Sequence, residues 1–162
     1  MNEFSIYKVL ADLKLPYEKI NHPAVFTTKE ADEYKLGKGV AKCKNLFLRN
    51  RKKTKYYLVV MESDKRFNLK EFSLQIDEKK LSFASEDDLM KYLKVTSGSV
   101  SPFTLINNDE KNVIAIVDDD LMKYKKVGFH PNINTATLVL TSNDFKKYLK
   151  SLNNTVVFTT LL

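Results

Sequence analysis

The longest apolar runs in this sequence are short, and their length limits the folds that the chain can adopt. Runs such as Tyr56–Met61 and Val113–Val117 have the length of β-strands. A helix that crosses a bilayer needs roughly 20 apolar residues, so we expect no membrane span and no membrane partner. The 162 residues suffice for one well-packed core but not for two ordinary ones, which predicts a single domain over residues 1–162.

Helix-like and strand-like segments alternate along the chain. Apolar spacing and capping residues predict helices over 4–13 and 27–34 and after Asn68, Ser85 and Ser142 or Asn143, with a helical turn from Asp118. Short apolar runs and alternating patterns predict strands over 44–49, 56–61, 80–83, 103–106, 113–117 and 134–141. Because hairpin-like pairs dominate, the fold class should be α+β, with a mixed, mostly antiparallel sheet and flanking helices. The pattern does not give the order of the strands.

Cysteine and histidine are scarce in the sequence. A single cysteine excludes an internal disulfide framework and fits a reducing cytoplasm, and the N-terminus lacks a signal-peptide pattern. His22, Cys43 and His130 are too widely separated for a transition-metal site, so we expect neither a metal nor another cofactor. Cys43 has no neighbouring histidine, which favours a small hydrophobic residue in a strand over a thiol nucleophile.

Positive charge is concentrated in one segment. The net charge is +7, and the stretch from Tyr34 to Met61 contains no acid but nine basic residues: Lys35, Lys38, Lys42, Lys44, Arg49, Arg51, Lys52, Lys53 and Lys55. Such a patch attracts polyanions in a salt-dependent way. The alternative is a solvated, solubilising surface, and charge alone does not identify tRNA.

Three short segments carry groups that could do chemistry. Lys44 and Asn45 precede an apolar alternation, which places a charge and an amide at the start of a strand. The segment 97–102 contains Gly98, and backbone amides in such a loop can stabilise a developing oxyanion. His130, just before a predicted strand, could donate to a carbonyl or move a proton. Each also has a purely structural explanation. Lys44 would be an ordinary surface lysine, the segment 97–102 an ordinary connection, and His130 a histidine hydrogen-bonded to the backbone at the end of a sheet.

Taken together and in order, these segments resemble the YbaK-like, prolyl-tRNA synthetase-associated editing domains, and among them the free-standing prolyl-tRNA editing proteins. The resemblance runs from about Ser5 to Leu149. It rests on His22–Thr27, Lys44–Arg49, Tyr57–Val60, Asp64–Arg66, Leu81–Ser85, Gly98–Phe103, Asp118–Leu121 and Phe129–Asn132.

The resemblance implies hydrolysis of the ester that joins an amino acid to the terminal ribose of tRNA, without a metal. It implies that Lys44 binds near the terminal phosphate and that Asn45, Gly98 and His130 complete the catalytic group. Residues expected to bind the aminoacyl group are Val25, Phe26, Thr27, Ser99, Val100, Ser101, Pro102, Phe103 and Asn132. Residues expected to bind tRNA are Lys42, Arg49, Lys52 and Lys53.

The resemblance also implies the partners: the acceptor end of mischarged tRNA(Pro) and, transiently, prolyl-tRNA synthetase. Alanine is the leading amino acid, because a synthetase site built for proline cannot strongly exclude a smaller one. We expect Val25, Phe26, Val100 and Phe103 to form pocket walls that refuse proline. Two alternatives remain: editing of another misacylated tRNA such as Cys-tRNA(Pro), and a non-catalytic tRNA-binding or regulatory module of the same fold.

Overall fold

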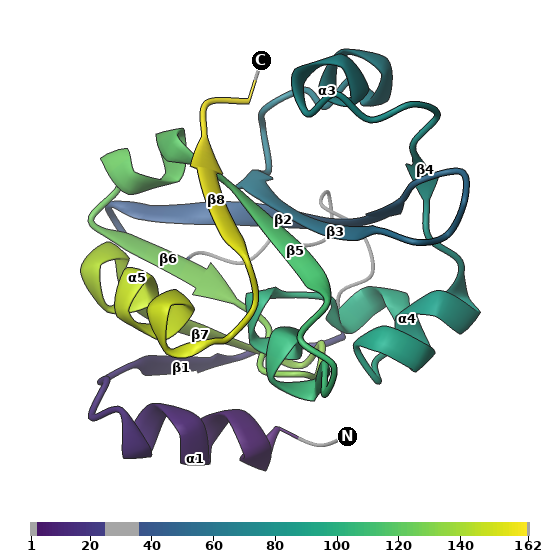
Figure 1. Cartoon of the computed structure of the whole chain (residues 1–162). Coiled ribbons are helices and arrows are strands. Elements are labelled where there is room, and N and C mark those ends of the chain that lie inside the picture. The colour runs from purple at the N-terminus through teal and green to yellow at the C-terminus, as the bar shows by residue number, and fades with distance from the viewer. Residues whose placement is uncertain (1–2, 25–35, 162) are drawn as a thin grey trace.

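The structure is a computed structural model that describes residues 3–24 and 36–161 (Figure 1). Its helices and strands are α1 (Phe4–Asp12), β1 (Glu18–Asn21), β2 (Val40–Arg49), β3 (Tyr56–Glu62), α3 (Leu69–Gln75), β4 (Ser82–Phe83), α4 (Glu86–Tyr92), β5 (Val113–Asp118), β6 (Lys126–Phe129), β7 (Ala136–Thr141), α5 (Ser142–Ser151) and β8 (Val156–Thr159). Three 3-10 helices, η1 (Ser97–Ser99), η2 (Pro102–Asn107) and η3 (Asp119–Lys123), connect them.

The strands form one mixed sheet in the order β1-β7-β6-β2-β3-β5-β8, with β4 paired to β2 outside this path. Four of the seven pairings between described strands are antiparallel: β1 with β7, β6 with β7, β2 with β3, and β2 with β4. The pairs β2–β6, β3–β5 and β5–β8 are parallel. The predicted α+β class and mixed sheet are therefore confirmed.

The long strand β2 joins two halves of this sheet. Its first residues, Val40–Lys42, pair with β6, and Cys43–Arg49 pair with β3. On the side away from β3, β4 pairs only with Leu48 and Arg49. The Phe47 carbonyl accepts a hydrogen bond from the Ala84 amide just after β4. No described strand pairs with residues 43–46 on that side, so the middle of β2 has one open edge inside the sheet.

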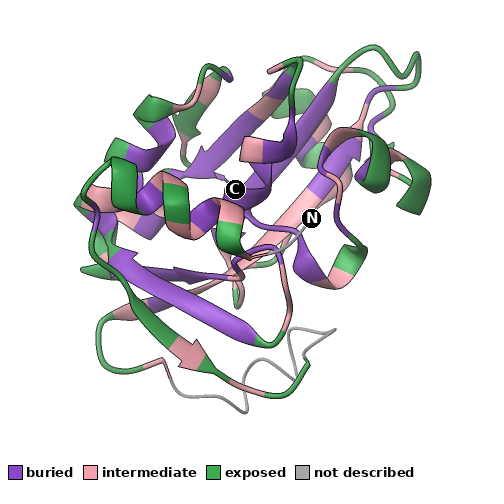
Figure 2. Ribbon diagram, turned by 90° about the horizontal axis from the view of Figure 1, so that it is seen from below, coloured by how far each residue is buried: buried purple, intermediate pink, exposed green. Residues whose placement is uncertain are grey.

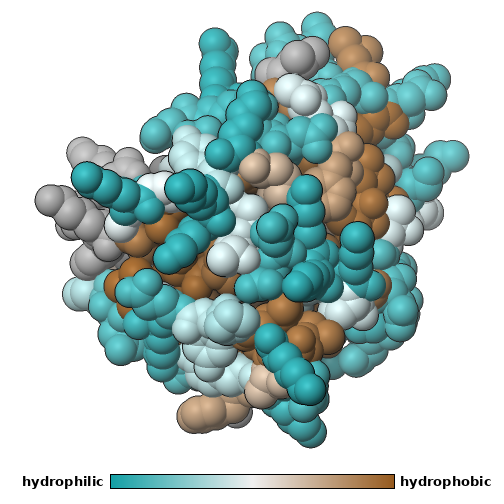
Figure 3. Space-filling model, turned by 90° about the vertical axis from the view of Figure 1, so that its left-hand side faces the viewer, coloured by the Kyte–Doolittle hydropathy of each residue, from teal (hydrophilic) through white to brown (hydrophobic). Residues whose placement is uncertain are grey.

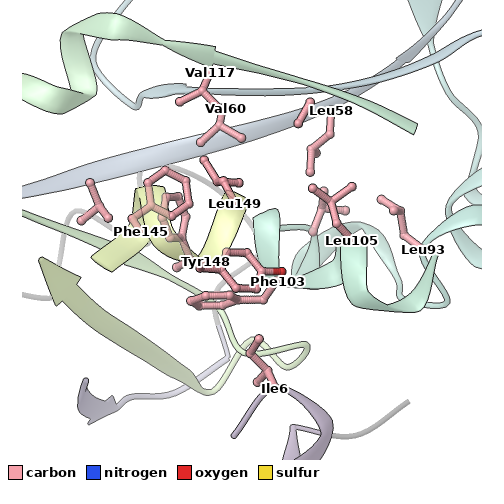
Figure 4. Packing of buried hydrophobic residues seen from close by; sticks show 14 of the residues in the cluster. Ile6, Leu58, Val60, Leu93, Phe103, Leu105, Val117, Phe145, Tyr148 and Leu149 are labelled. Carbon is pink, nitrogen blue, oxygen red and sulfur yellow. The ribbon is translucent and has the colours of Figure 1, made fainter. Parts of the chain in front are cut away.

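The two faces of the sheet bury separate apolar clusters. The larger cluster includes Phe103, Phe145 and Tyr148, with Ile6 of α1 packed from below (Figure 4). The smaller cluster contains Leu48, and α3 covers it with Phe72. Figure 2 shows the central strands buried while the helices keep exposed outer surfaces. Successive side chains of β2 therefore lie on opposite faces of the sheet, one face covered by the larger cluster and the other by the smaller.

Several predicted elements are confirmed together with the residues that begin them. The Asn68 side chain accepts a hydrogen bond from the Glu71 amide, and Ser85 forms a capping box with Asp88. The helix α5 is present, but its cap is Thr141, whose hydroxyl accepts from the Asp144 amide. The helix predicted over 27–34 lies outside the described residues.

The strand predicted over 103–106 is wrong, because this segment is the 3-10 helix η2. The Ser101 hydroxyl accepts from the Phe103 amide at 3.1 Å, and the Thr104 hydroxyl donates back to the Ser101 carbonyl. Pro102 at the first position already has the backbone angle that a helical turn needs. These local bonds outweigh the strand propensity of a short apolar run. Sequence reasoning also missed β1, β6 and β8, which are only four residues each.

Within the described parts of the chain, no helix is long and apolar enough to cross a membrane. The face drawn in Figure 3 is covered mainly by hydrophilic residues, with smaller apolar areas between them.

Candidate active site

Lys44 lies in the middle of β2, on its open edge. It is the fifth residue of the strand, so its predicted place at a strand start is wrong. Lys44 is opposite Met61 and Asn45 is opposite Val60 in β3. Met61 belongs to the smaller cluster and Val60 to the larger. Because successive side chains of a strand alternate, Lys44 and Asn45 point to opposite faces and can approach a ligand at the open edge from both sides.

The ammonium of Lys44 is fixed rather than loose. It donates a hydrogen bond to the backbone carbonyl of Lys65, in the turn after β3. Partial burial lowers the pKa of Lys44, and the nearby Asp64 carboxylate opposes that shift. A partly desolvated cation held in one place interacts more strongly with an anion than an exposed lysine does.

Lys65 is itself anchored by two carboxylates. Its ammonium lies 2.7 Å from Asp118 Oδ2 and 2.9 Å from Asp120 Oδ2. Burial alone would lower the pKa of Lys65, but the hydrogen bonds to these carboxylates outweigh burial and raise it. Lys65, Asp118 and Asp120 belong to segments that carry the family resemblance, and no role was predicted for them from the sequence. An acid at the end of an apolar strand, Asp118, was the signal that could have found the cluster.

His130 directly follows β6 and precedes β7 by several residues, so its predicted place just before a strand is wrong. The parallel pairing of β2 with β6 ends at Lys42 and Gly128, so His130 lies two residues beyond its last pair, at the end of the sheet where β2 loses this neighbour. Nδ1 of His130 lies 2.9 Å from the Ala136 carbonyl oxygen. A carbonyl only accepts, so Nδ1 carries the proton and the neutral ring offers Nε2 as an acceptor.

The neutral form of His130 is favoured by its surroundings. Burial lowers the pKa of His130, and His22, whose ring centroid is 5.7 Å away, lowers it further. Nε2 of His22 lies 2.9 Å from the hydroxyl of Thr137 on β7. With Nδ1 bonded to the Ala136 carbonyl, the neutral ring can accept a proton or a hydrogen bond at Nε2.

Two asparagines predicted to contact substrate have buried polar atoms without partners. Within the described residues, neither Oδ1 of Asn45 nor the Oδ1 and Nδ2 of Asn132 forms a hydrogen bond. Asn132 also adopts a left-handed backbone conformation, with φ of 65°. Such unsatisfied groups are costly to bury, and they commonly await a ligand or water at a functional site.

The loop that contains Gly98 contacts the His130 segment. The Ser101 hydroxyl donates to the His130 carbonyl at 2.8 Å, and the buried Tyr148 hydroxyl donates to the Pro102 carbonyl at 2.8 Å. Ser99 and Val100 keep a small exposed area, 7% and 8%, whereas Phe103 has none. Phe103 packs edge-to-face on Tyr148 (Figure 4), so it supports the loop from the core instead of forming an open pocket wall.

The residues expected to bind tRNA differ in their surroundings. Lys52 and Lys53 are exposed in the turn between β2 and β3. Arg49 is paired with Asp88 at 3.0 Å, which also caps α4. Lys42 lines a polar cavity of about 360 Å³ together with Val40, Glu62, Ser63, Asp64 and Tyr124. Val25, Phe26 and Thr27 lie outside the described residues.

Cys43 points toward the larger cluster and is partly buried. Its Sγ lies 3.7 Å from the Ala41 carbonyl oxygen, and burial strongly raises the pKa of the thiol. Among residues 3–24 and 36–161, no group of three or more His, Cys, Asp or Glu side chains could hold a metal ion.

The sequence model of the aminoacyl-tRNA editing domain matches residues 22–148, which include Lys44, Asn45, the Gly98 loop and His130. The chain belongs to the aminoacyl-tRNA editing domain family. Among its relatives in this family, the prolyl-tRNA editing protein ProX of Acetoanaerobium sticklandii is 42% identical over 146 residues, which cover 90% of this chain and 89% of that protein. The prolyl-tRNA synthetase associated domain-containing protein 1 of Bos taurus is 34% identical over 145 residues, covering 88% and 85%.

Solved structures share the fold of this editing domain. A candidate trans-editing enzyme for prolyl tRNA synthetase superposes with a TM-score of 0.67 at 20% identity, covering 95% of each chain. A hypothetical protein superposes with a TM-score of 0.76 at 18% identity, covering 98% of each chain.

Proposed function

We propose that the chain is a trans-editing aminoacyl-tRNA deacylase that hydrolyses the ester of mischarged tRNA(Pro), with Ala-tRNA(Pro) as the leading substrate. The observation that carries this proposal is the 42% identity, over nearly the full length of both chains, to a prolyl-tRNA editing protein. The arrangement around the open edge of β2 supports it independently, because that arrangement offers what ester hydrolysis requires.

Hydrolysis of this ester needs a positioned acyl group, charge stabilisation and one water. In the proposed site, Lys44 holds a phosphate of the terminal nucleotide, and the unpartnered amide oxygen of Asn45 accepts a hydrogen bond from the aminoacyl end. Neutral His130 accepts a hydrogen bond at Nε2 from the substrate ammonium or the attacking water. The water adds to the carbonyl carbon, the ester bond to ribose breaks, and the ribose oxygen leaves as a hydroxyl after taking a proton.

The proposed preference for alanine depends on the size of the aminoacyl pocket. Val100 and the backbone of the Gly98 loop form one side of that pocket in the proposal, and Asn132 forms another. A pocket that admits alanine and sterically rejects proline would clear the error without destroying correctly charged tRNA. Cys-tRNA(Pro) is the second candidate, because cysteine is also smaller than proline.

The partners follow from this chemistry. We infer that the chain binds the acceptor end of tRNA(Pro) and meets prolyl-tRNA synthetase only transiently. We also infer that residues 1–162 act as one domain and that the protein works in the cytoplasm, where charged tRNA is found.

The test is deacylation of a panel of tRNA(Pro) charged with alanine, cysteine or proline, with and without EDTA. We expect rapid loss of alanine, persistence of proline and no effect of EDTA. Faster release of cysteine would select the alternative substrate. Salt-sensitive binding of tRNA without any deacylation would instead favour the non-catalytic tRNA-binding module.

A further inference from the structure

Asp118 is a fully buried acid at the end of β5. Its Oδ2 lies 2.7 Å from the ammonium of Lys65, and its Oδ1 accepts from the Asp120 amide at 3.0 Å. An acid buried among apolar residues is retained only where it is paired, because an unpaired buried charge is very costly. The ammonium of Lys65 is therefore anchored at the end of β5.

Lys65 connects that fixed point to Lys44. Its side chain reaches Asp118 and Asp120, while its backbone carbonyl accepts the hydrogen bond from the Lys44 ammonium. The residue thus uses its two ends for two different contacts. Because the carbonyl and the side chain share one Cα, anchoring the ammonium restrains where the Lys65 carbonyl can lie.

The turn itself does not need the Lys65 side chain to close. The Ser63 amide donates to the Lys42 carbonyl at 2.8 Å, and the Lys65 amide donates to the Glu62 carbonyl at 3.1 Å. These backbone bonds connect the turn to the first residues of β2 and to the end of β3. The backbone bonds already close the turn. The carboxylate contacts of Lys65 add a restraint on the orientation of its peptide group.

We propose that Lys65 and Asp118 are positioning residues, which aim the Lys44 ammonium into the open edge of β2 through the backbone carbonyl of Lys65. The proposal rests on the proposed function for the role of Lys44, but not for the connection between the three residues. Asp120, whose side chain is 29% exposed, gives a second, weaker anchor for the same lysine.

The first experiment is a double-mutant cycle in single-turnover deacylation of Ala-tRNA(Pro). Lys65→Met should slow the reaction roughly 10- to 100-fold, the scale expected from a small misplacement of a reacting group. In a Lys44→Ala background the same change should have less than about a 3-fold effect, because the two substitutions remove one function. Lys65→Arg should recover part of the rate, since a guanidinium can bridge both carboxylates.

The matched control is Lys94→Met, which removes another lysine–aspartate pair, Lys94 with Asp109 at 2.8 Å, away from β2. It should leave the rate unchanged. Additive losses from Lys65→Met and Lys44→Ala, or an equal loss from Lys94→Met, would overturn the proposal.

The second experiment does not depend on catalysis. Competitive acylation across a pH series, read by peptide mass spectrometry, gives the apparent pKa of each lysine. Lys44 should titrate below the usual lysine value of about 10.4 in the wild type, with Asp64 as the charged neighbour that limits the difference. In Lys65→Met, and in Asp120→Asn to a smaller extent, the Lys44 pKa should rise toward the usual lysine value.

The two experiments separate the two claims. If no mischarged tRNA is deacylated but the Lys44 titration moves as expected, the positioning role stands and the proposed function fails. An unchanged Lys44 titration in folded Lys65→Met would overturn the positioning role whatever the activity. If Asp118→Asn folds, the same two measurements are made on it. If it does not fold, the Lys65 and Asp120 variants are sufficient for the test.

Discussion

The imidazole Nδ1 of His130 lies 2.9 Å from the carbonyl oxygen of Ala136, six residues later in the chain. This contact connects the end of β6 to the start of β7 and fixes the tautomer of the ring. On the neutral ring, Nε2 then has the lone pair that can accept a hydrogen bond. Protonation of His130 would remove this acceptor.

Deacylation should therefore lose rate in acid. Burial holds the pKa of His130 below its usual value of about 6.5, and the neutral ring is the competent form. Single-turnover rates should stay constant above about pH 6.5 and fall as the pH drops through the lowered pKa. His130→Gln cannot titrate, so its slower rate should show no acid limb from this residue.

His22→Gln serves as the comparison for this profile. His22 contributes to the lowered pKa of His130, so its replacement should shift the acid limb to higher pH and not remove it. If the limb vanished in His22→Gln and persisted in His130→Gln, the titrating group would be His22.

Lys44→Ala should slow deacylation by roughly 100-fold or more, the scale of losing one preorganised charge contact. Lys146→Ala, an exposed lysine on α5, is the control. The measurement is the rate at subsaturating Ala-tRNA(Pro). Near wild-type turnover of Lys44→Ala would remove this lysine from the site.

Replacing Lys52 and Lys53 together with alanine should weaken tRNA binding and leave the chemical step intact. Each lost phosphate contact should flatten the plot of log affinity against log salt by roughly 0.7–0.9. Rates at saturating protein should match wild type. The control, Lys146→Ala with Lys150→Ala, removes the same charge from α5. Equal salt slopes for the two double variants would mean that the β2–β3 turn faces away from the RNA.

Cys43→Ala should keep alanine deacylation within a few-fold of wild type. Burial raises the pKa of the thiol, so the nucleophilic thiolate is scarce at neutral pH. The assay is deacylation together with mass spectrometry for a thioester. Trapped aminoacyl-Cys43 would contradict this expectation.

Phe103→Ala should destabilise the protein by about 3–5 kcal/mol, as truncation of a buried aromatic side chain usually does. The reason is its contacts with Tyr148 and Phe129, at centroid distances of 5.3 and 5.8 Å. Denaturant unfolding measures the effect. A stable variant with relaxed selectivity against proline would instead make Phe103 a pocket wall.

Local patterns in the sequence were sufficient for the elements that local interactions specify. The strand β3 and the caps of α3 and α4 are encoded within a few residues and were predicted correctly, whereas β2 was predicted to begin at Lys44 and begins at Val40. The strand expected over 103–106 failed because the Ser101 hydroxyl and Pro102 favour a 3-10 turn, which a short apolar run does not reveal. Four-residue strands such as β6 form only because neighbours pair with them, so the sequence alone gives little sign of them.

The candidate site shows the same division. Lys44, Asn45 and His130 were identified by resemblance and chemistry, but the contact of Lys44 with Lys65 crosses 21 positions. The ion pair of Lys65 with Asp118 crosses 53. Such contacts depend on the strand order, which no local pattern contains.

The open edge of β2 has a consequence for amide hydrogen exchange. Backbone amides of a central strand usually exchange slowest, because both neighbours hold them. Between residues 43 and 46, amides directed at β3 should be protected, whereas those directed at the open edge lack a described partner strand. A central strand with alternating exchange rates would then report ligand occupancy directly, since a bound acceptor end would slow only the fast half of the pattern.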